Sequence, residues 1–174
     1  RLLRQNLWAG HPPAFFCGGL FIGSSDAQQI SLRVVRPQQL DADGQPHDNM
    51  LCYHSGVAEQ YLWPMIDEIM DRYRPGGFWF DGSCFTVMNC YCAKCRQRFH
   101  RDHKLNAPAS AKQPGWAAYK EMQRQIYREF CAQTAARIKQ RDPACLVAVN
   151  WAYALRMPEE PPRGVDYFTG DHGC

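Results

Sequence analysis

The sequence contains no apolar run near the roughly 20 residues that a transmembrane helix needs, and its mean hydropathy is low, at -0.49. It carries little net charge, +3 over 174 residues, which is too small to indicate a nucleic-acid partner. It shows no signal-peptide pattern, internal repeat or low-complexity segment. We therefore expect neither a membrane nor a nucleic acid among the partners of this protein.

The length fits one domain, and a hydrophobic fraction of 45% is enough to build a core. The chain begins at Arg1 rather than at a methionine, and it ends at Cys174 without a polar tail. We interpret residues 1–174 as a piece of a longer protein, truncated at both ends.

Apolar runs alternate with segments of helical periodicity along the chain. The runs predict strands over Phe15–Ile22, Phe78–Phe80, Leu146–Val149 and Val165–Phe168, with 30–35 either a strand or an irregular insertion. The periodic segments predict helices over 57–73, started or kinked by Pro64, over 91–104 and over 116–139. Asp41–Asp48 has the Gly and Pro residues of a turn.

The strands over 78–80 and 146–149 lack polar alternation, which is typical of parallel strands covered on both faces. The alternation of strands and helices therefore predicts an α/β fold with a helix-covered parallel sheet. Four strands indicate either a small open sheet or about half of a (β/α)8 TIM barrel, which needs roughly 250 residues when complete.

Polar residues follow three of these strands, where α/β folds bind their ligands: Asp81, Asn150 and Asp171. Aromatic neighbours would raise the pKa of Asp81, as suits a general acid, whereas the simpler interpretation makes it a helix or turn cap. Glycosidases need two carboxylates. The candidates for the second are Glu159, Glu160, Asp166 and Asp171, of which Asp171 is the better one because it follows a strand. Trp79 and Trp151 are candidate platforms for sugar rings, and His54 is a candidate substrate contact.

Cysteine is abundant, with nine residues, and four of them fall within twelve positions: Cys84, Cys90, Cys92 and Cys95. A C-x-C-x2-C run suits a structural zinc site, which takes about four thiolate or imidazole ligands. The fourth ligand is open among Cys52, Cys84, His54, His100 and His103. Reduced structural thiols are the alternative. The spacing does not match the C-x3-C-x2-C pattern of radical enzymes, which disfavours an iron–sulfur cluster.

Two glycosidase families resemble different parts of the sequence. Met50–Ser55, followed by a helix, a strand-end acid and Cys90–Cys95, resembles family 42 β-galactosidases. That resemblance implies a structural zinc held by Cys52, Cys90, Cys92 and Cys95. It also implies that Asp81 stands where the family has its general-acid glutamate.

The stretch Tyr61–Gly82, which includes the run Tyr73–Gly82, is similar to family 29 α-L-fucosidases, in which the aspartate of a W-F-D-G-like strand end is the nucleophile. The Asp-Ala-Asp-Gly-x-Pro turn before a Cys-x-x-Ser segment also resembles a group of hypothetical glycosyl hydrolases. These resemblances leave Asp81 either a nucleophile or an acid/base.

We therefore expect one fragment of a single glycoside hydrolase barrel, inactive by itself, with Asp81 and Asp171 as catalytic residues. Its partner would be an oligosaccharide or glycoside, bound by His54, Trp79, Asn150 and Trp151. A non-catalytic carbohydrate-binding or zinc-stabilised interaction module is the alternative. The sequence does not decide whether the protein forms a homo-oligomer. Clustered reduced cysteines favour a cytoplasmic location, although a full-length form could be secreted.

Overall fold

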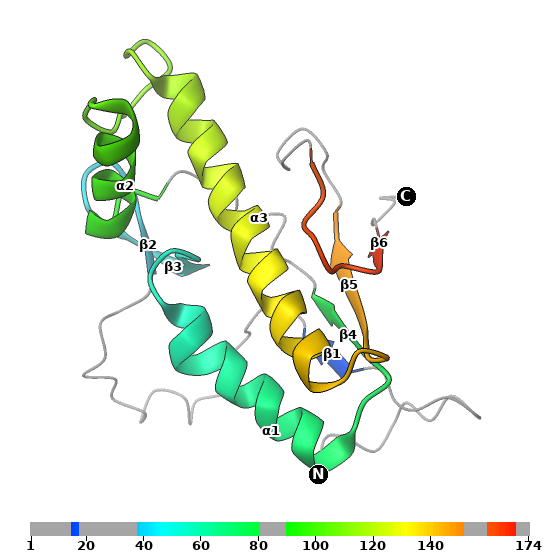
Figure 1. Cartoon of the computed structure of the whole chain (residues 1–174). Coiled ribbons are helices and arrows are strands. Elements are labelled where there is room, and N and C mark those ends of the chain that lie inside the picture. The colour runs from blue at the N-terminus through cyan, green and yellow to red at the C-terminus, as the bar shows by residue number, and fades with distance from the viewer. Residues whose placement is uncertain (1–14, 18–37, 81–89, 152–159, 170–174) are drawn as a thin grey trace, which may run out of the picture.

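The computed structural model describes residues 15–17, 38–80, 90–151 and 160–169 as a mixed α/β structure (Figure 1). Within these residues a four-stranded sheet packs against long helices, and a two-stranded hairpin lies apart from it. None of the described helices is both long and apolar enough to cross a membrane.

The main sheet consists of β1 (Phe15–Cys17), β4 (Gly77–Phe80), β5 (Leu146–Asn150) and β6 (Tyr167–Thr169). Its strands are all parallel and lie in the order β1-β4-β5-β6, which follows the chain without reversal. A doubly wound sheet reverses its order at a switch point, whereas successive strands of a barrel do not. The predicted parallel sheet is therefore confirmed, and its strand order is not that of a doubly wound sheet. Within the described residues the sheet does not close.

The helices begin and end close to the predicted positions. A π-helical segment, η2 (Ala58–Leu62), leads into α1 (Trp63–Tyr73), and Pro64 lies in the first turn of α1, where a missing backbone N–H costs nothing. α2 (Ala93–His103) and α3 (Trp116–Arg141) follow β4. Arg74 and Lys104 end α1 and α2 in the left-handed conformation.

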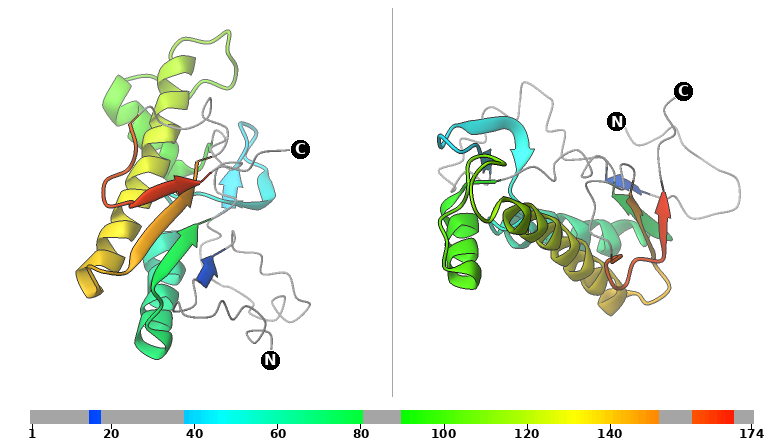
Figure 2. Two further views of the ribbon diagram at one scale, coloured as in Figure 1. Left: turned by 90° about the vertical axis from the view of Figure 1, so that its right-hand side faces the viewer. Right: turned by 90° about the horizontal axis from the view of Figure 1, so that it is seen from above.

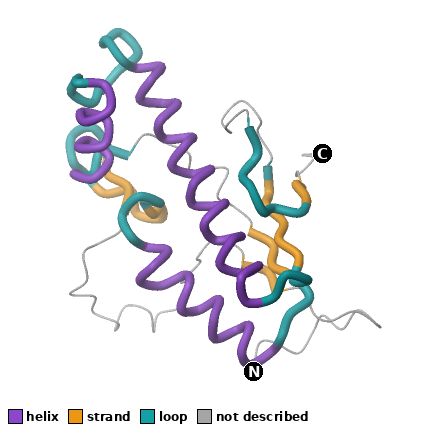
Figure 3. Tube along the Cα trace, in the orientation of Figure 1, coloured by secondary structure: helices purple, strands orange, loops and turns teal. Residues whose placement is uncertain are grey.

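Helices α1 and α3 lie against the same side of the sheet (Figures 2 and 3). Phe78 pairs with Val147 and Phe80 with Val149, so these four side chains share one face of adjacent strands. They form a buried core with residues of α1 and α3, among them Ile66, Met70, Tyr127 and Ile138. The opposite face is covered as well, because Ala148, which lies between Val147 and Val149 and points the other way, is fully buried. Burial of both faces explains why β5 lacks polar alternation.

The hairpin of β2 (Gln38–Leu40) and β3 (Pro46–Leu51) was not predicted as strands. Its sequence is polar and lacks the apolar alternation that marks a half-buried strand. The predicted turn is confirmed in a shorter form. The Asp41 carboxylate accepts hydrogen bonds from the backbone N–H groups of Asp43 (2.9 Å) and Gln45 (2.8 Å), and Gly44 supplies a φ of 82°.

Replacing Ile66 by alanine tests the core between α1 and the sheet. Ile66 is fully buried, so Ile66→Ala should lower the free energy of unfolding by about 2–5 kcal/mol because the cavity only partly collapses. Urea unfolding followed by circular dichroism measures the loss. Glu68→Ala, at an exposed position of the same helix, is the control and should cost much less. Equal stability of both variants would contradict this packing.

Candidate metal centre and the neighbouring cavity

Four cysteine sulfurs converge beside the hairpin. The Sγ atoms of Cys52, Cys90, Cys92 and Cys95 all lie within 4.8 Å of one another. Cys52 Sγ is 3.6 Å from the Sγ atoms of both Cys92 and Cys95. A tetrahedral zinc ion with Zn–S bonds of about 2.3 Å requires S···S separations of about 3.8 Å. The residues therefore fit a tetrahedral ion after small adjustments.

Local backbone structure brings these thiols together. Cys52 follows β3, and its carbonyl accepts hydrogen bonds from the Ser55 backbone N–H (3.0 Å) and the Ser55 hydroxyl (2.6 Å), which closes a tight turn. Cys92 is the N-cap of α2 in an extended conformation, so Cys95 falls in the first turn of that helix. The Tyr91 N–H donates to the Leu40 carbonyl (2.8 Å) and ties this segment to the hairpin.

Side chains of helix α3 form hydrogen bonds to the cysteine segment. The Tyr119 hydroxyl and the Gln123 amide both donate to the Cys90 carbonyl, at 2.6 and 3.2 Å. Phe99 of α2 packs edge-on against Tyr119, with ring centroids 4.9 Å apart. These residues and the cysteines form a second buried core, separate from that of the sheet. The ligand positions are thus held by packed side chains as well as by the backbone.

The burial of the cluster bears on its chemistry. Cys52, Cys90 and Cys95 are at most 2% exposed and Cys92 is half-buried, so four thiol groups are available to fill a tetrahedral coordination shell. Hydrogen bonds from Cys52 and its neighbours lower the pKa of Cys92, whereas those interactions and burial raise the pKa of Cys95. This donor set could hold a soft cation in a structural role rather than a catalytic one.

The predicted strand-end residues have mixed positions. Asp81 and Asp171 lie outside the described residues, as does Cys84. Asn150 is fully buried at the end of β5, and the half-buried Trp79 donates from Nε1 to the Thr169 hydroxyl at 2.8 Å. The half-buried ring of Trp151 packs between Tyr127 and Phe168, with centroid distances of 5.8 and 5.2 Å.

Two other carboxylates that we considered for catalysis have structural partners. Asp166 pairs with Lys139 (2.7 Å) and accepts the backbone N–H of Val147 (2.7 Å), near the amino end of β5 and thus opposite the expected ligand edge. Glu160 pairs with Arg128. Neither carboxylate is therefore placed to act at the carboxyl ends of the strands.

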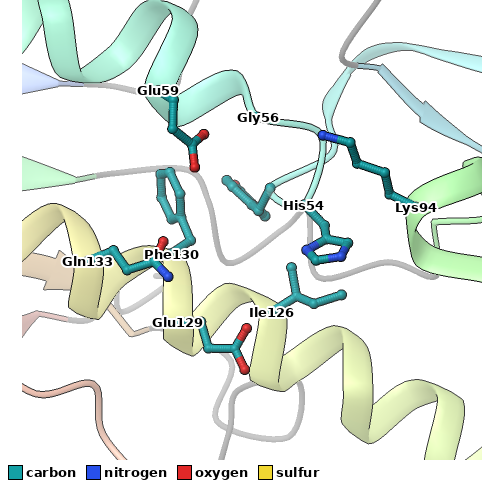
Figure 4. A pocket seen from close by; sticks show the side chains of 9 residues that line it. His54, Gly56, Glu59, Lys94, Ile126, Glu129, Phe130 and Gln133 are labelled. Carbon is teal, nitrogen blue, oxygen red and sulfur yellow. The ribbon is translucent and has the colours of Figure 1, made fainter. Parts of the chain in front are cut away.

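His54 lies in a cavity of about 310 Å³ between η2, α2 and α3 (Figure 4). We call it the His54 cavity, and its lining residues are Tyr53, His54, Gly56, Glu59, Lys94, Ile126, Glu129, Phe130 and Gln133. Burial and the nearby Arg98 guanidinium lower the pKa of His54. Of these lining residues, only His54 was predicted from the sequence to belong to a site. The spacing of residues 126, 129, 130 and 133 places polar and apolar side chains together on one face of α3, and this pattern could have predicted the other lining residues.

A bidentate ion pair closes one side of this region. Arg98 of α2 donates to both carboxylate oxygens of Glu129 on α3, at 2.6 and 2.7 Å. This hydrogen bonding lowers the pKa of Glu129. The pair also connects α2 to α3 beside the cysteine cluster.

The fold of this chain is similar to that of a solved structure. It is a polyextremophilic beta-galactosidase from the Antarctic haloarchaeon Halorubrum lacusprofundi, matched with a TM-score of 0.59 and 16% sequence identity. The match covers 79% of this chain and 27% of that chain, so the likeness spans about a quarter of the longer protein. At this identity the likeness shows a shared fold. No protein-family model and no curated protein matches the sequence.

Loss of one cysteine should abolish tight metal binding. Outer partners of metal ligands already contribute about 10–100-fold to affinity, so Cys95→Ser, which removes a ligand, should lower zinc affinity by more than about a hundredfold. The affinity of the unaltered protein should also fall as the pH falls, because protons compete for the thiolates. A chromophoric chelator competition measures both effects.

The control for that experiment is Cys145→Ser. Cys145 is an equally buried thiol outside the cluster, and its replacement should leave the metal stoichiometry unchanged. Retention of zinc by Cys95→Ser, or loss of zinc from both variants, would contradict the four-cysteine site.

The ion pair of Arg98 and Glu129 predicts a pH-dependent stability. Because the folded-state pKa of Glu129 is lowered, its contribution is present above the ordinary carboxylate range and is lost as the pH falls through the folded pKa. Glu129→Gln should therefore lower the thermal unfolding midpoint at neutral pH, and this deficit should shrink in acid. Glu121→Gln, at another ion-paired glutamate of α3, is the matched control and should show a smaller deficit at neutral pH. A deficit for Glu129→Gln that is independent of pH would refute the pairing.

Proposed function

We propose that this chain is part of a (β/α)8 glycoside hydrolase that cleaves O-glycosyl bonds in an oligosaccharide or glycoside. The observation that carries the proposal is the singly wound parallel sheet, whose fold resembles a beta-galactosidase over 79% of the chain. Because fold alone does not establish chemistry, the residues at the strand ends must supply the rest of the argument.

The carboxyl ends of β4, β5 and β6 lie side by side, since these strands are parallel and in register. Asp81 directly follows β4, and Asp171 comes two residues after β6. In the proposed site, Asp81 acts as a nucleophile or as an acid/base, and Asp171 serves as the second carboxylate. We also assign sugar binding to Asn150, Trp79 and Trp151, which lie within β4 and β5 or directly after β5.

We further propose that zinc occupies the four-cysteine site. Zinc there supplies a cross-link, joining the turn after β3 to the start of α2. The cluster is closed by its own ligands, so the proposed reaction is carried by carboxylates. The cysteines act by holding the Cys52 turn, and with it His54, against α2 and α3.

Replacing Asp81 tests the proposed activity. In the natural full-length protein, Asp81→Asn should lower hydrolysis of its nitrophenyl glycoside substrate by about a thousandfold or more, because the amide can neither attack nor exchange a proton. A panel that includes β-galactosides and α-L-fucosides identifies the sugar. Asp43→Asn, at an exposed position of the hairpin turn, is the matched control. Unchanged turnover by Asp81→Asn would reject the role of this residue.

A non-catalytic carbohydrate-binding module is the second candidate. It is favoured by the ion pairs of Asp166 and Glu160, which remove two of the carboxylates that we considered for catalysis. This function predicts that sugars bind to the full-length protein without turnover of any glycoside in the panel.

A further inference from the structure

Among the described residues, none of the parallel sheet lines the His54 cavity. Its lining comes from the turn after β3, from η2, from the first turn of α2 and from α3 (Figure 4). A volume of about 310 Å³ is at the lower end of the range for small-molecule sites and suits one small ring.

Several polar side chains around the cavity have unused hydrogen-bonding capacity. Within the part of the chain that the structure describes, the side chains of His54, Glu59 and Gln133 make no hydrogen bond to another residue, and those of Glu59 and Gln133 are exposed. Lys94 uses one of its three N–H groups, donating to the Ser55 carbonyl at 2.9 Å. The set therefore offers acceptors on the carboxylate, donors on the ammonium, and both kinds on the imidazole and the amide.

The charges around the cavity balance. Lys94 and Glu59 are one cation and one anion of the lining, and Glu129 is neutralised by Arg98. A neutral ligand is therefore favoured over a free anion or cation. A metal ion is disfavoured as well, because the cysteine cluster is the one group among the described residues whose ligand atoms converge closely enough to hold one.

One wall of the cavity is apolar. Ile126 and Phe130 project from α3 into the lining next to Tyr53, which packs on the Phe130 ring with centroids 4.5 Å apart. An aromatic and aliphatic wall facing polar groups matches a sugar ring, whose C–H face is apolar and whose hydroxyl groups both donate and accept.

We propose that the His54 cavity binds a single neutral sugar ring. The ring lies with its C–H face on Phe130, and its hydroxyl groups bond to Glu59, Lys94, His54 and Gln133. This site goes beyond the proposed function, because it uses neither Asp81 nor Asp171; of its residues, only His54 was expected from the sequence to contact the glycoside.

The cysteine cluster holds this site together. His54 is two residues after Cys52, and Lys94 lies between Cys92 and Cys95. The bond from Lys94 to the Ser55 carbonyl spans the two ligand-bearing segments. Removal of the metal should therefore loosen the cavity from two sides and weaken sugar binding.

A titration with monosaccharides tests the proposal. The zinc-loaded protein is titrated with galactose, glucose and fucose while backbone amide shifts are followed by nuclear magnetic resonance. We expect saturable shifts at Lys94 and Gln133 with at least one sugar. Glu59→Ala and Gln133→Ala should each weaken that binding by about tenfold, because each removes hydrogen-bond partners of the sugar. Chelation of the zinc should weaken it further.

The matched controls are Glu68→Ala on α1 and Gln140→Ala on α3, two exposed positions outside the cavity. Both should bind sugar as the unaltered protein does. Asp81→Asn should also bind normally at this site, so failure of the proposed hydrolysis and failure of this site are separate outcomes. The proposal is overturned if no sugar shifts the cavity amides, if the controls lose as much binding as the cavity variants, or if glycine or inorganic phosphate binds there more tightly than every sugar.

Discussion

The convergence of four thiols is the constraint on which the arrangement of α2, the hairpin and the cavity depends. Helix α2 buries only Cys95 and Phe99 among its eleven residues, and an isolated helix of that length is marginal in water. Three interactions set its position. The Sγ atoms of Cys92 and Cys95 converge with that of Cys52, Arg98 pairs with Glu129, and side chains of α3 donate hydrogen bonds to the Cys90 carbonyl. Each of these interactions joins segments that are distant in the sequence, so the cluster organises the chain around it.

A row of aromatic rings connects this cluster to the edge of the sheet. Tyr53 follows Cys52 and packs on Tyr127 at 5.3 Å, Tyr127 packs on Trp151 at 5.8 Å, and Trp151 meets Phe168 at 5.2 Å. Helix α3 supplies the central ring, so the turn that carries a metal ligand is in packed contact with the carboxyl end of β5. Interiors packed in this way transmit displacements rather than absorb them. The cysteine cluster and the carboxyl end of β5 are therefore connected by continuous packing, although no strand residue among those described lines the His54 cavity.

Much of this arrangement could be predicted from periodicity and spacing. The unalternating run Phe78–Phe80 predicted a parallel strand, and the regular spacing in 116–139 predicted α3 to within two residues at its end. The hairpin strands escaped notice because their residues are polar, so hydrophobic alternation carries no signal there. The cavity escaped because Glu59, Glu129 and Gln133 look like the solvated face of a helix until tertiary packing brings η2, α2 and α3 together. For Asp81 and Asp171 the sequence prediction stands by itself, because both lie outside the described residues.

The order of the strands bears on the larger architecture. In β1-β4-β5-β6 each strand pairs with the next strand of the sheet in chain order. Such a sheet has two edges, and β6 carries Tyr167 and Phe168 at its edge, 49% and 40% exposed. Exposed aromatic edge strands are liabilities that proteins cover or pair. In the proposed barrel a further parallel strand would pair with β6 and cover this edge, and it would bring another strand end beside Thr169. The same step of assembly would therefore protect the exposed edge and extend the row of strand ends on which the proposed hydrolysis depends.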